Sequence, residues 1–389
     1  MSVRVAHLVS HPIHYQAPLY RELAARPELD LTVYFYSDAS VRGYRDVEFG
    51  HEVQWDTPLL EGYRSRFLPS AARTGIQSRY GQRPNWDVLG EVLSDGYEAL
   101  WVHGYAHTNA WLATAGAALR GPRVLIREEQ TLLHGRPWYV RALKETALRA
   151  LFARTYGLYI GEQNRRYFVH YGLDDDRLFP APYCVDNDYF RRRAEELRPR
   201  RNELRARFGI EDDVPVVLYV AKLIPKKAPL VLLDAFKQVR ERQQCALLFV
   251  GEGELRAELE AAVGPDVHLA GFLNQSELPE AYVAADVFCL PSILHETWGL
   301  VVNEALNFGL PVVVSDKVGC AADLVHPGWN GFVVPAGQPT PLADALEQLV
   351  ADAELRAEYG ARGAQLIRTY SIEACADGIV AACRAAASE

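Results

Sequence analysis

Two glutamates, Glu296 and Glu304, stand in the otherwise apolar stretch HETWGLVVNEALNFGLP. Gly309 and Pro311 are helix stop signals, so the sequence predicts a helix that runs from Gly299 to Gly309. The side chains of this helix are apolar around nearly its whole circumference, which predicts that the helix is buried. A buried carboxylate without a hydrogen-bond donor is costly. Glu304 therefore needs a donor, and the stretch alone leaves open whether the protein or a ligand supplies it.

Short β-rich runs alternate with helical patterns along the whole chain, and these elements must position the two carboxylates. The strand candidates are VRVAHLV, LDLTVYFY, YEALWVH, RVLIRE and GLYIG in the first half, and VPVVLYVA, CALLFVG, VHLAGF, DVFCLP and LPVVVSD in the second. This alternation predicts an α/β fold with parallel sheets covered by helices on both faces. Ligands of such sheets bind at the carboxyl ends of the strands. The loop HETWG follows DVFCLP and is therefore expected at that edge.

The chain has 389 residues, which exceeds the size at which a single hydrophobic core stops growing, so two domains are expected. A stretch rich in proline and charge places the boundary near residues 180–195. We predict an N-terminal Rossmann-like domain over residues 1–185 and a C-terminal one over residues 186–372. The remaining segment, 373–389, reads as an amphipathic helix that starts from a Ser cap.

Composition narrows the class of protein. Hydrophobic residues make up 49% and charged residues 23% of the chain, as in an ordinary globular protein. A net charge of −9 argues against nucleic acid as a partner, because phosphate backbones demand a basic footprint. The six cysteines include no Cys-x-x-Cys pair, which predicts reduced thiols in a cytoplasmic protein. We see no signal peptide and no segment approaching the roughly 18 apolar residues of a membrane span, so the protein is expected to be soluble and at most peripheral to a membrane.

Five motifs in order resemble those of the family-four retaining glycosyltransferases of GT-B fold. They are PYCVDNDYF for the interdomain linker, YVAKLIPKKAPLVLLDAF for the basic nucleotide-diphosphate motif, FVGEGELRAELE for the glycine turn, HLAGFLNQSELPEAYVAADVFCLPS, and HETWGLVVNEALNFGLPVVVSDKVG for the glutamate pair. The N-terminal half matches only weakly. The resemblance implies two Rossmann-like domains facing across a cleft, with the final helix crossing back to the N-terminal domain.

The donor diphosphate site implied by this resemblance also has a physical basis. The amides of Trp298, Gly299 and Leu300 open a helix, and such ends attract anions through unpaired N–H groups and the helix dipole. Gly299 lets a ligand approach the backbone closely. Lys222 and Lys227 follow the strand VVLYVA at the spacing of the family's basic pair. The family usually has arginine where Lys222 stands, and lysine cannot form a bidentate fork, which predicts looser diphosphate binding.

The resemblance also implies the roles of the carboxylates and of the glycine turn. Glu304 would accept hydrogen bonds from the ribose hydroxyls of the donor nucleotide. Glu296 would hold hydroxyls of the transferred sugar and serve as a catalytic residue. Gly251 and Gly253 would line the nucleotide site, although a purely structural turn explains them equally well.

The implied activity is that of a retaining, metal-independent hexosyltransferase. It would move a sugar from a nucleoside-diphosphate sugar, UDP- or GDP-linked, to an acceptor hydroxyl in polysaccharide, glycolipid or natural-product synthesis. No cofactor and no metal are implied, since the acidic triplet DND at 186–188 reads as solvated surface. The alternatives are a hydrolysing sugar-nucleotide epimerase and a non-catalytic nucleotide-sugar-binding subunit.

In the N-terminal half, the stretch VLIREEQTLLHG departs from the family pattern, because relatives carry a histidine there. Arg127, Glu128 and Glu129 stand in its place. We expect Glu128 to face the cleft as a catalytic residue, with an ion pair to Arg127 or another basic residue as the equal alternative. His103 follows the strand EALWV at the same sheet edge and is either catalytic or a hydrogen-bonded structural residue.

The loop after the first strand supplies the acceptor-side candidates, His14 and Tyr15. It leads into a helix N-terminus, where contact with the acceptor or with the diphosphate is expected. His7, His11 and His14 do not share one helical face, which argues against a metal site there.

Residues 136–157, RPWYVRALKETALRALFARTYG, are basic on balance and begin with aromatic residues. They read either as a peripheral contact with the inner face of an anionic membrane or as an ordinary amphipathic surface helix.

Overall fold

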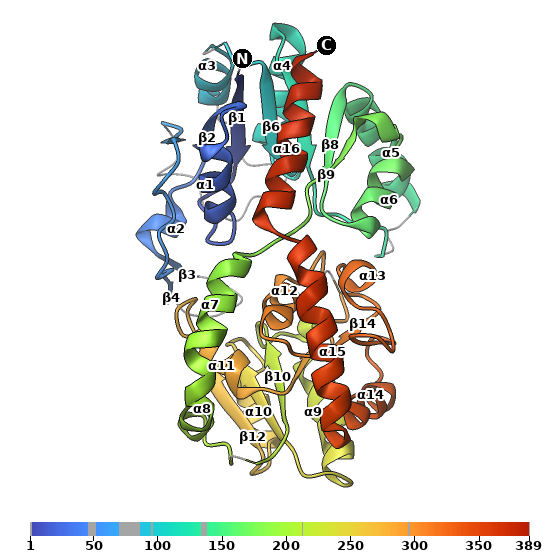
Figure 1. Cartoon of the computed structure of the whole chain (residues 1–389). Helices are drawn as coiled ribbons and strands as arrows, with labels where there is room; N and C mark the ends of the chain where they lie inside the picture. Colours follow the sequence, from blue (N-terminus) through green and yellow to red (C-terminus); the bar gives the residue numbers. More distant parts are fainter. Residues whose placement is uncertain are drawn as a thin grey trace. The chain divides into compact units, whose positions relative to one another are not determined.

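The computed structural model describes residues 2–45, 52–69, 86–94, 96–133, 138–211, 213–294 and 296–388 (Figure 1). The chain divides into two compact units. The N-terminal unit comprises Met1–Tyr44, Val53–Tyr183 and Ile372–Glu389, and the C-terminal unit comprises Arg45–Glu52 and Cys184–Ser371. The main division, between Tyr183 and Cys184, lies two residues before the boundary expected from the sequence.

The sheet of the N-terminal unit is parallel, with its strands in the order β5-β2-β1-β6-β7-β8-β9. The strands are β1 (Val3–Val9), β2 (Leu29–Phe35), β5 (Ser65–Phe67), β6 (Ala99–His103), β7 (Arg123–Arg127), β8 (Thr155–Tyr159) and β9 (Leu178–Pro180). The helices of this unit are α1 (Ala17–Ala25), α2 (Ala39–Arg42), α3 (Asp87–Ser94), α4 (Thr108–Arg120), α5 (Trp138–Phe152), α6 (Glu162–His170) and α16 (Ile372–Ala387). A separate pair joins β3 (Tyr44–Arg45) to β4 (Glu52–Val53).

The sheet of the C-terminal unit is also parallel, in the order β12-β11-β10-β13-β14-β15. Its strands are β10 (Val216–Val220), β11 (Ala246–Val250), β12 (Val267–Gly271), β13 (Val287–Leu290), β14 (Val312–Ser315) and β15 (Gly331–Val334). Its helices are α7 (Asn187–Leu197), α8 (Arg201–Arg207), α9 (Pro229–Arg240), α10 (Arg256–Ala262), α11 (Leu278–Ala284), α12 (Leu300–Asn307), α13 (Ala321–Leu324), α14 (Pro339–Ala351) and α15 (Ala353–Leu366).

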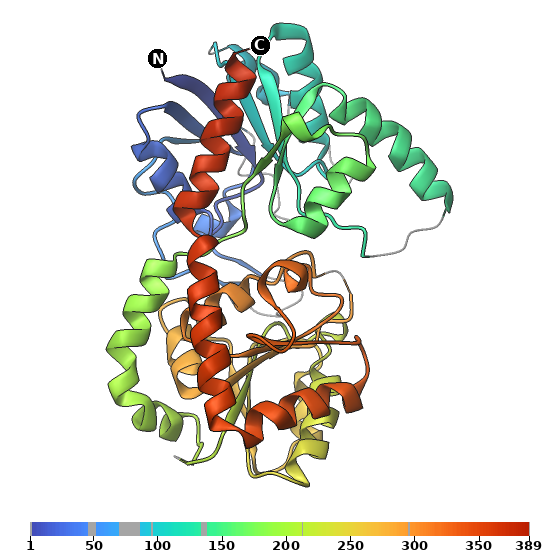
Figure 2. The ribbon, with the colours of Figure 1, turned by 45° about the vertical axis from the view of Figure 1, so that its right-hand side comes forward.

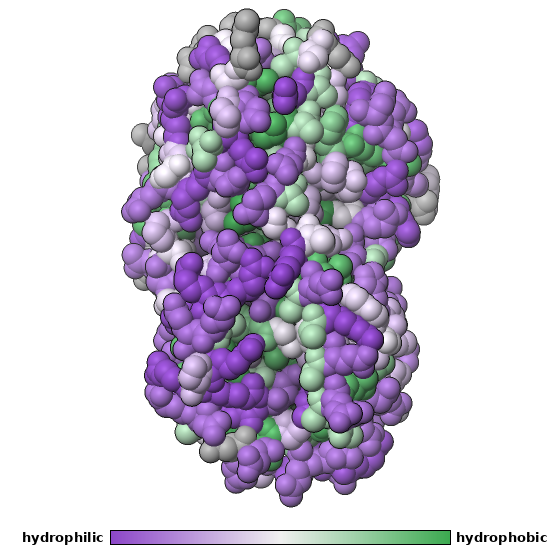
Figure 3. Space-filling model, viewed as in Figure 1, coloured by the Kyte–Doolittle hydropathy of each residue, from purple (hydrophilic) through white to green (hydrophobic). Residues whose placement is uncertain are grey.

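Each predicted strand candidate forms a strand of one of these sheets. The central strands are buried along their whole length, as in β10 and β11, because helices cover both faces of a parallel sheet. The predicted α/β class with parallel sheets is therefore confirmed. On the face shown in Figure 3, hydrophilic residues cover most of the surface of each unit, so the apolar sides of the helices face the sheets.

The last helix, α16, belongs to the N-terminal unit although it follows the whole C-terminal unit in the chain. It packs against α1 and against β7, β8 and β9, and both ribbon views show it lying along that sheet (Figures 1 and 2). Gly378 allows this approach, because a Cβ there would stand 1.5 Å from the carbonyl oxygen of Pro180. Two further observations concern the described residues: no helix is both long and apolar enough to cross a bilayer, and all six cysteines are buried and none forms a disulfide.

Candidate active site

The polar residues of the C-terminal unit gather where β11, β10 and β13 end. These three strands are neighbours in the sheet, so the segments that follow them meet at one edge. The segment after β10 carries Lys222 and Lys227, the turn after β11 carries Gly251, and the segment after β13 carries Glu296. The structure thus brings the predicted donor-site residues to the same edge.

Backbone hydrogen bonds hold the lysine-bearing segment in place. The Leu223 amide donates to the Glu252 carbonyl at 2.8 Å, and the Ile293 amide donates to the Lys226 carbonyl at 2.9 Å. A Cβ at Gly251 would stand 2.0 Å from the Ala221 carbonyl oxygen, at a φ of +137° that favours glycine. The glycine turn therefore has a structural role, because it lets the segment after β11 approach the segment after β10.

Glu296 is held by two side chains of this edge. The Lys227 ammonium donates to Oε2 of Glu296, and the Ser292 hydroxyl donates to the same oxygen at 3.0 Å. The Glu296 side chain is 10% exposed and the Lys227 side chain 20% exposed, so this ion pair is largely shielded from solvent. The two residues that sequence reasoning placed on the sugar and on the diphosphate are thus in direct contact, a pairing that their separation in the chain did not reveal.

The predicted helix after Glu296 is confirmed as α12, which spans Leu300–Asn307 and ends two residues before Gly309. Gly299 precedes it with a φ of +99°, a conformation that glycine adopts at little cost. The Trp298 indole N–H donates to Oδ1 of Asn303 at 2.8 Å, and this side chain is buried. Trp298 could therefore reach a ligand through its backbone rather than its ring.

Tyr282 of α11 supplies the hydrogen-bond donor that Glu304 requires, because its hydroxyl donates to Oε2 of Glu304 at 2.7 Å. Glu304 is 6% exposed, and this burial raises its pKa to about 7, while the bond from Tyr282 acts in the opposite direction. Tyr282 stacks on Phe308 with ring centroids 5.0 Å apart. Sequence reasoning missed Tyr282, which lies in the quoted motif but shows no spacing relation to Glu304.

In the N-terminal unit, Glu128 follows β7 and is held by the backbone. Its Oε1 accepts from the amides of Glu129 and Gln130 at 3.1 and 3.2 Å, and its Oε2 accepts from the Tyr105 amide at 3.2 Å. Burial and the neighbouring Glu129 raise the pKa of Glu128 to about 7, against the effect of these amides. Arg127 donates to the Ala181 carbonyl at 3.3 Å.

Glu129 is the carboxylate that contacts the other predicted side chains. His103 Nε2 lies 3.1 Å from Oε1 of Glu129, and the Tyr183 hydroxyl donates to the same oxygen. The Tyr15 hydroxyl lies 3.1 Å from that of Tyr183. Burial alone would raise the pKa of Glu129, but the bond and charge of His103, with Tyr183 and Arg127, bring this pKa below its usual value.

His103 joins this network through Nε2, which also lies 3.4 Å from Nε2 of Gln16. Its Nδ1 is buried and has no partner among the described residues. Sequence reasoning missed Glu129 and Tyr183 as site residues. The adjacent Glu128 and Glu129 were indistinguishable there, because neighbours in an extended segment point to opposite sides.

His7 of β1 and His14 of the loop that follows it have structural contacts within the N-terminal unit. The His14 ring lies 3.9 Å from that of Trp55, and burial lowers the pKa of His14 to about 3. His7 is bonded at both ring nitrogens, to the Trp101 carbonyl at 3.1 Å and the Tyr20 hydroxyl at 3.0 Å. The structure therefore brings Tyr15 to His103 and Glu129 and leaves His14 against Trp55. Within the described ranges, no group of His, Cys, Asp and Glu is placed to hold a metal ion.

A cavity of about 390 Å³ lies beside Glu128, between the segments after β6 and β7 and the helix α5. We call it the Glu128 cavity. Aromatic residues Tyr105 and Trp111 line it, with Gln130 and Lys144 as further polar groups. The Lys144 ammonium stands 4.9 Å from the ring centroid of Tyr167. A polar substrate with an apolar part could enter this cavity and meet the Glu128 carboxyl group.

The helix α5 covers most of the predicted membrane contact, residues 136–157, of which 136 and 137 lie outside the described residues. It exposes large apolar side chains: Trp138 is 79% exposed, Tyr139 60% and Leu143 76%.

Comparison with known proteins matches residues 200–366 to the family of glycosyl transferases group 1. The chain is 32% identical over 212 residues to the alpha-D-kanosaminyltransferase of Streptomyces kanamyceticus, an alignment that covers 53% of each chain. It is 38% identical over 160 residues to the phosphatidyl-myo-inositol mannosyltransferase of Mycobacterium leprae, covering 40% of this chain and 42% of that one. The chain thus spans about half the length, or less, of the curated relatives it matches.

Two solved structures resemble the chain over nearly its whole length. A glycosyltransferase from Rickettsia africae has a TM-score of 0.76 at 12% identity, covering 99% of this chain and 98% of that one. Anabaena HepE in complex with UDP and glucose has a TM-score of 0.70 at 16% identity, covering 97% and 98%. At these identities the likeness shows the fold, and it confirms the predicted GT-B class with two Rossmann-like domains.

Proposed function

Because residues 200–366 match the family of glycosyl transferases group 1, we propose that the protein transfers a hexose from a nucleoside-diphosphate sugar to an acceptor hydroxyl. The observation that carries this proposal is the ion pair of Lys227 with Glu296 at the carboxyl ends of β10 and β13, beside the start of α12. The names of the relatives, a kanosaminyl- and a mannosyltransferase, and the UDP complexes of HepE support a nucleotide-sugar donor.

The donor diphosphate is proposed to bind between Lys222, Lys227 and the amides that open α12. Cations and helix N-termini stabilise the charge that develops on a leaving diphosphate. Lys227 would then be shared between the diphosphate and Glu296, which ties the position of the sugar-binding carboxylate to that of the leaving group. Glu304, oriented by Tyr282, would accept the ribose hydroxyls.

We propose that the transfer retains the anomeric configuration and needs neither metal nor cofactor. The bond from the anomeric carbon to the acceptor oxygen forms on the face from which the phosphate leaves. The acceptor proton passes to a phosphate oxygen of the leaving nucleoside diphosphate, so the reaction balances without a protein base. The side chains then act by position and charge.

The acceptor is proposed to bind the N-terminal unit at the Glu128 cavity. Its aromatic wall would take an apolar part of the acceptor, and the Glu128 carboxyl group would meet the hydroxyl. The neighbouring bond of His103 to Glu129 would fix the shape of this edge rather than exchange protons. The exposed aromatic residues of α5 are compatible with peripheral membrane contact, which co-sedimentation with anionic liposomes at low salt would test.

The first experiment is a thermal-shift panel of UDP, GDP, ADP, dTDP and their common sugars, run beside Lys222→Ala. A ligand at one hundred times its dissociation constant stabilises the protein by about 2.7 kcal/mol. A shift with one nucleotide series that the variant lacks would support the donor site and identify the base. The absence of a thermal shift with every nucleotide would contradict the proposed donor site. With the donor known, NMR of the product gives its anomeric configuration, and an EDTA control tests metal independence.

Measurements of turnover distinguish the proposed transferase from the two alternative functions. Release of nucleoside diphosphate and free sugar epimer without an acceptor would identify a hydrolysing epimerase. Donor binding without release in any acceptor screen would identify a binding subunit.

A further inference from the structure

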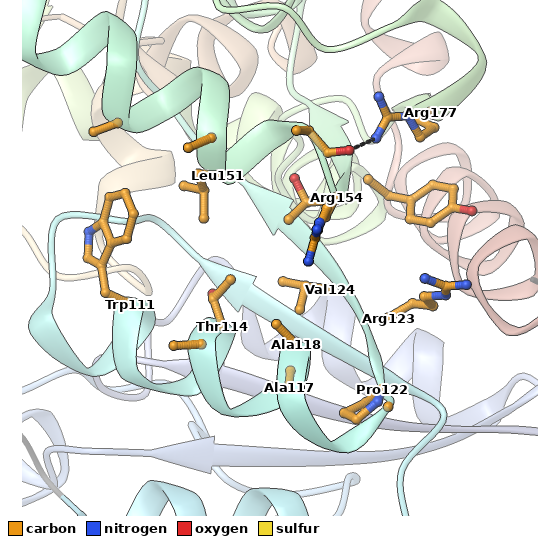
Figure 4. A pocket seen from close by; sticks show the side chains of 17 residues that line it. Trp111, Thr114, Ala117, Ala118, Pro122, Arg123, Val124, Leu151, Arg154 and Arg177 are labelled. Carbon is orange, nitrogen blue, oxygen red and sulfur yellow. Dashed lines mark hydrogen bonds between the residues drawn. The ribbon is translucent and has the colours of Figure 1, made fainter.

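A second cavity, of about 590 Å³, lies in the N-terminal unit between α4 and α5 (Figure 4). We call it the α4–α5 cavity. Its volume is in the range of sites that hold small organic ligands. Figure 4 shows Trp111 at one end and the side chains of Arg123, Arg154 and Arg177 toward the other.

The cavity exists because the facing sides of the two helices carry alanines. Ala118 of α4 and Ala147 and Ala150 of α5 line it, and their side chains are too short to meet across the gap. Such a surface is apolar and offers few hydrogen bonds. It suits the apolar body of a ligand rather than a sugar or a ribose.

One polar group in the cavity lacks a partner. Thr155, at the start of β8, lines the cavity and is 2% exposed. Its hydroxyl oxygen is buried and forms no hydrogen bond among the described residues. A buried hydroxyl without a partner is costly, and a ligand with an acceptor atom would remove that cost.

The charge of the cavity is positive at the arginine end. Arg123, Arg154 and Arg177 line it, and no carboxylate does within the described residues. Arg177 is paired with Asp174 at 2.9 Å and donates to the Ala153 carbonyl at 2.9 Å. Arg154 has no hydrogen bond or ion pair in the described part of the chain. An anionic group would be attracted to this end.

The arginine end of the cavity lies away from the candidate active site, although the two cavities share Trp111 and Ala147. Arg123 and Thr155 are the first residues of β7 and β8, so the arginine end lies at the amino ends of these strands. Glu128 and His103 lie at the carboxyl ends of the same sheet. An anionic group at the arginines would therefore lie at the opposite edge of the sheet from Glu128, while an apolar body that reached Trp111 would contact the wall shared with the Glu128 cavity.

We propose that the α4–α5 cavity binds an amphiphilic anion. The apolar body lies against Trp111 and the alanines, and the anionic group, a phosphate, sulfonate or carboxylate, pairs with Arg154 beside Arg123. An oxygen of that group accepts from the Thr155 hydroxyl. This inference stands on the cavity itself and does not depend on the proposed transferase activity.

The test uses the full chain and 8-anilinonaphthalene-1-sulfonate, followed by fluorescence, with displacement by dodecyl phosphate. We expect one bound dye per chain, displaced by dodecyl phosphate but not by an equal concentration of inorganic phosphate. Arg154→Glu and Ala150→Trp should each weaken dodecyl phosphate binding at least tenfold. The matched controls, Arg384→Glu on α16 and Ala142→Trp on the exposed side of α5, should stay within twofold of the parent.

Several outcomes would overturn the proposal. The first is that Ala142→Trp weakens dodecyl phosphate binding as much as Ala150→Trp does. The second is that AMP displaces the dye at a lower concentration than dodecyl phosphate. The third is that phosphatidylglycerol vesicles bind the protein although neither monomeric probe does. If Ala150→Trp unfolds the unit, Arg154→Glu and Thr155→Val keep the test valid, since the first residue is exposed and the second change preserves volume. Thr155→Val should weaken binding about threefold.

Discussion

The two units have the same architecture but hold their carboxylates in different ways. In the C-terminal unit Glu296 is paired with a lysine, Lys227, across two neighbouring segments. In the N-terminal unit Glu129 is paired with a histidine, His103. The C-terminal pair therefore places an ammonium group at its edge of the sheet, and the N-terminal pair places an imidazole ring there.

Each unit also buries a second carboxylate that is easily protonated. Burial raises the pKa of Glu304 to about 7, and burial with the nearby Glu129 does the same for Glu128. Glu304 receives one bond from a tyrosine, while Glu128 receives three from backbone amides. The family match over residues 200–366 covers the Lys227–Glu296 ion pair. The N-terminal site lies outside that match, and hydrogen bonds to backbone amides, a histidine and a tyrosine hold its two glutamates.

The largest expected effect tests the lysine pair. Lys227→Ala removes a cation from the leaving diphosphate and leaves Glu296 with Ser292, so kcat/KM for transfer should fall about 10²- to 10³-fold. Steady-state kinetics with the donor found by thermal shift measures this effect. Lys237→Ala, on the exposed side of α9, is the control and should leave kcat/KM unchanged. A loss of less than about fivefold in Lys227→Ala would mean that the C-terminal unit does not hold the leaving group.

The glycine turn should show the next effect, on stability. Gly251→Ala forces a Cβ onto the Ala221 carbonyl at a φ that disfavours side chains, and it should lower the free energy of unfolding of the C-terminal unit by about 3 kcal/mol. Urea unfolding measures the difference. Gly264→Ala is the matched control, because its Cβ would meet nothing within 4 Å. Equal stabilities of the two variants would show that the turn is not tightly packed.

The raised pKa of Glu304 predicts a pH dependence of stability. The folded state binds this proton more tightly than the unfolded state, so the stabilisation is complete below the unfolded pKa and is lost as pH rises through about 7. The loss should be on the order of 3 kcal/mol. The free energy of unfolding, measured between pH 4.5 and 8, should fall less steeply with pH for Glu304→Gln than for the parent. Glu258→Gln, exposed on α10, should keep the parent's slope, and a slope unchanged in Glu304→Gln would contradict the prediction.

The smallest effect tests the histidine pair. His103→Gln should lower kcat/KM for the acceptor about tenfold while leaving the dissociation constant of the donor unchanged, because His103 shapes the edge of the N-terminal unit. Kinetics with varied acceptor and calorimetry with the donor separate these quantities. His170→Gln, exposed on α6, serves as the control. Weaker binding of the donor nucleotide sugar by His103→Gln would contradict the proposed division of roles between the units.

The sequence alone predicted the α/β class, the central strands and the helix α12, because continuous apolar runs and helix stop signals are local features. It missed β5, β9 and β15, whose three or four residues carry little pattern. The edge that gathers Lys222, Lys227 and Glu296 was predictable from the strands before them.

The contacts within the sites were not predictable, because each joins residues far apart in the chain. Tyr282 and Glu304 are 22 residues apart, Lys227 and Glu296 69, and Tyr183 and Tyr15 168. No local spacing encodes such pairs. The choice between Glu128 and Glu129 needed the direction of each side chain, which only the folded segment defines.

The position of α16 has a consequence for synthesis of the protein. This helix packs against α1 and the sheet of the N-terminal unit, yet all of residues 184–371 precede it on the ribosome. The N-terminal unit therefore cannot bury the surface that α16 covers until all of the sequence of the C-terminal unit has been synthesised.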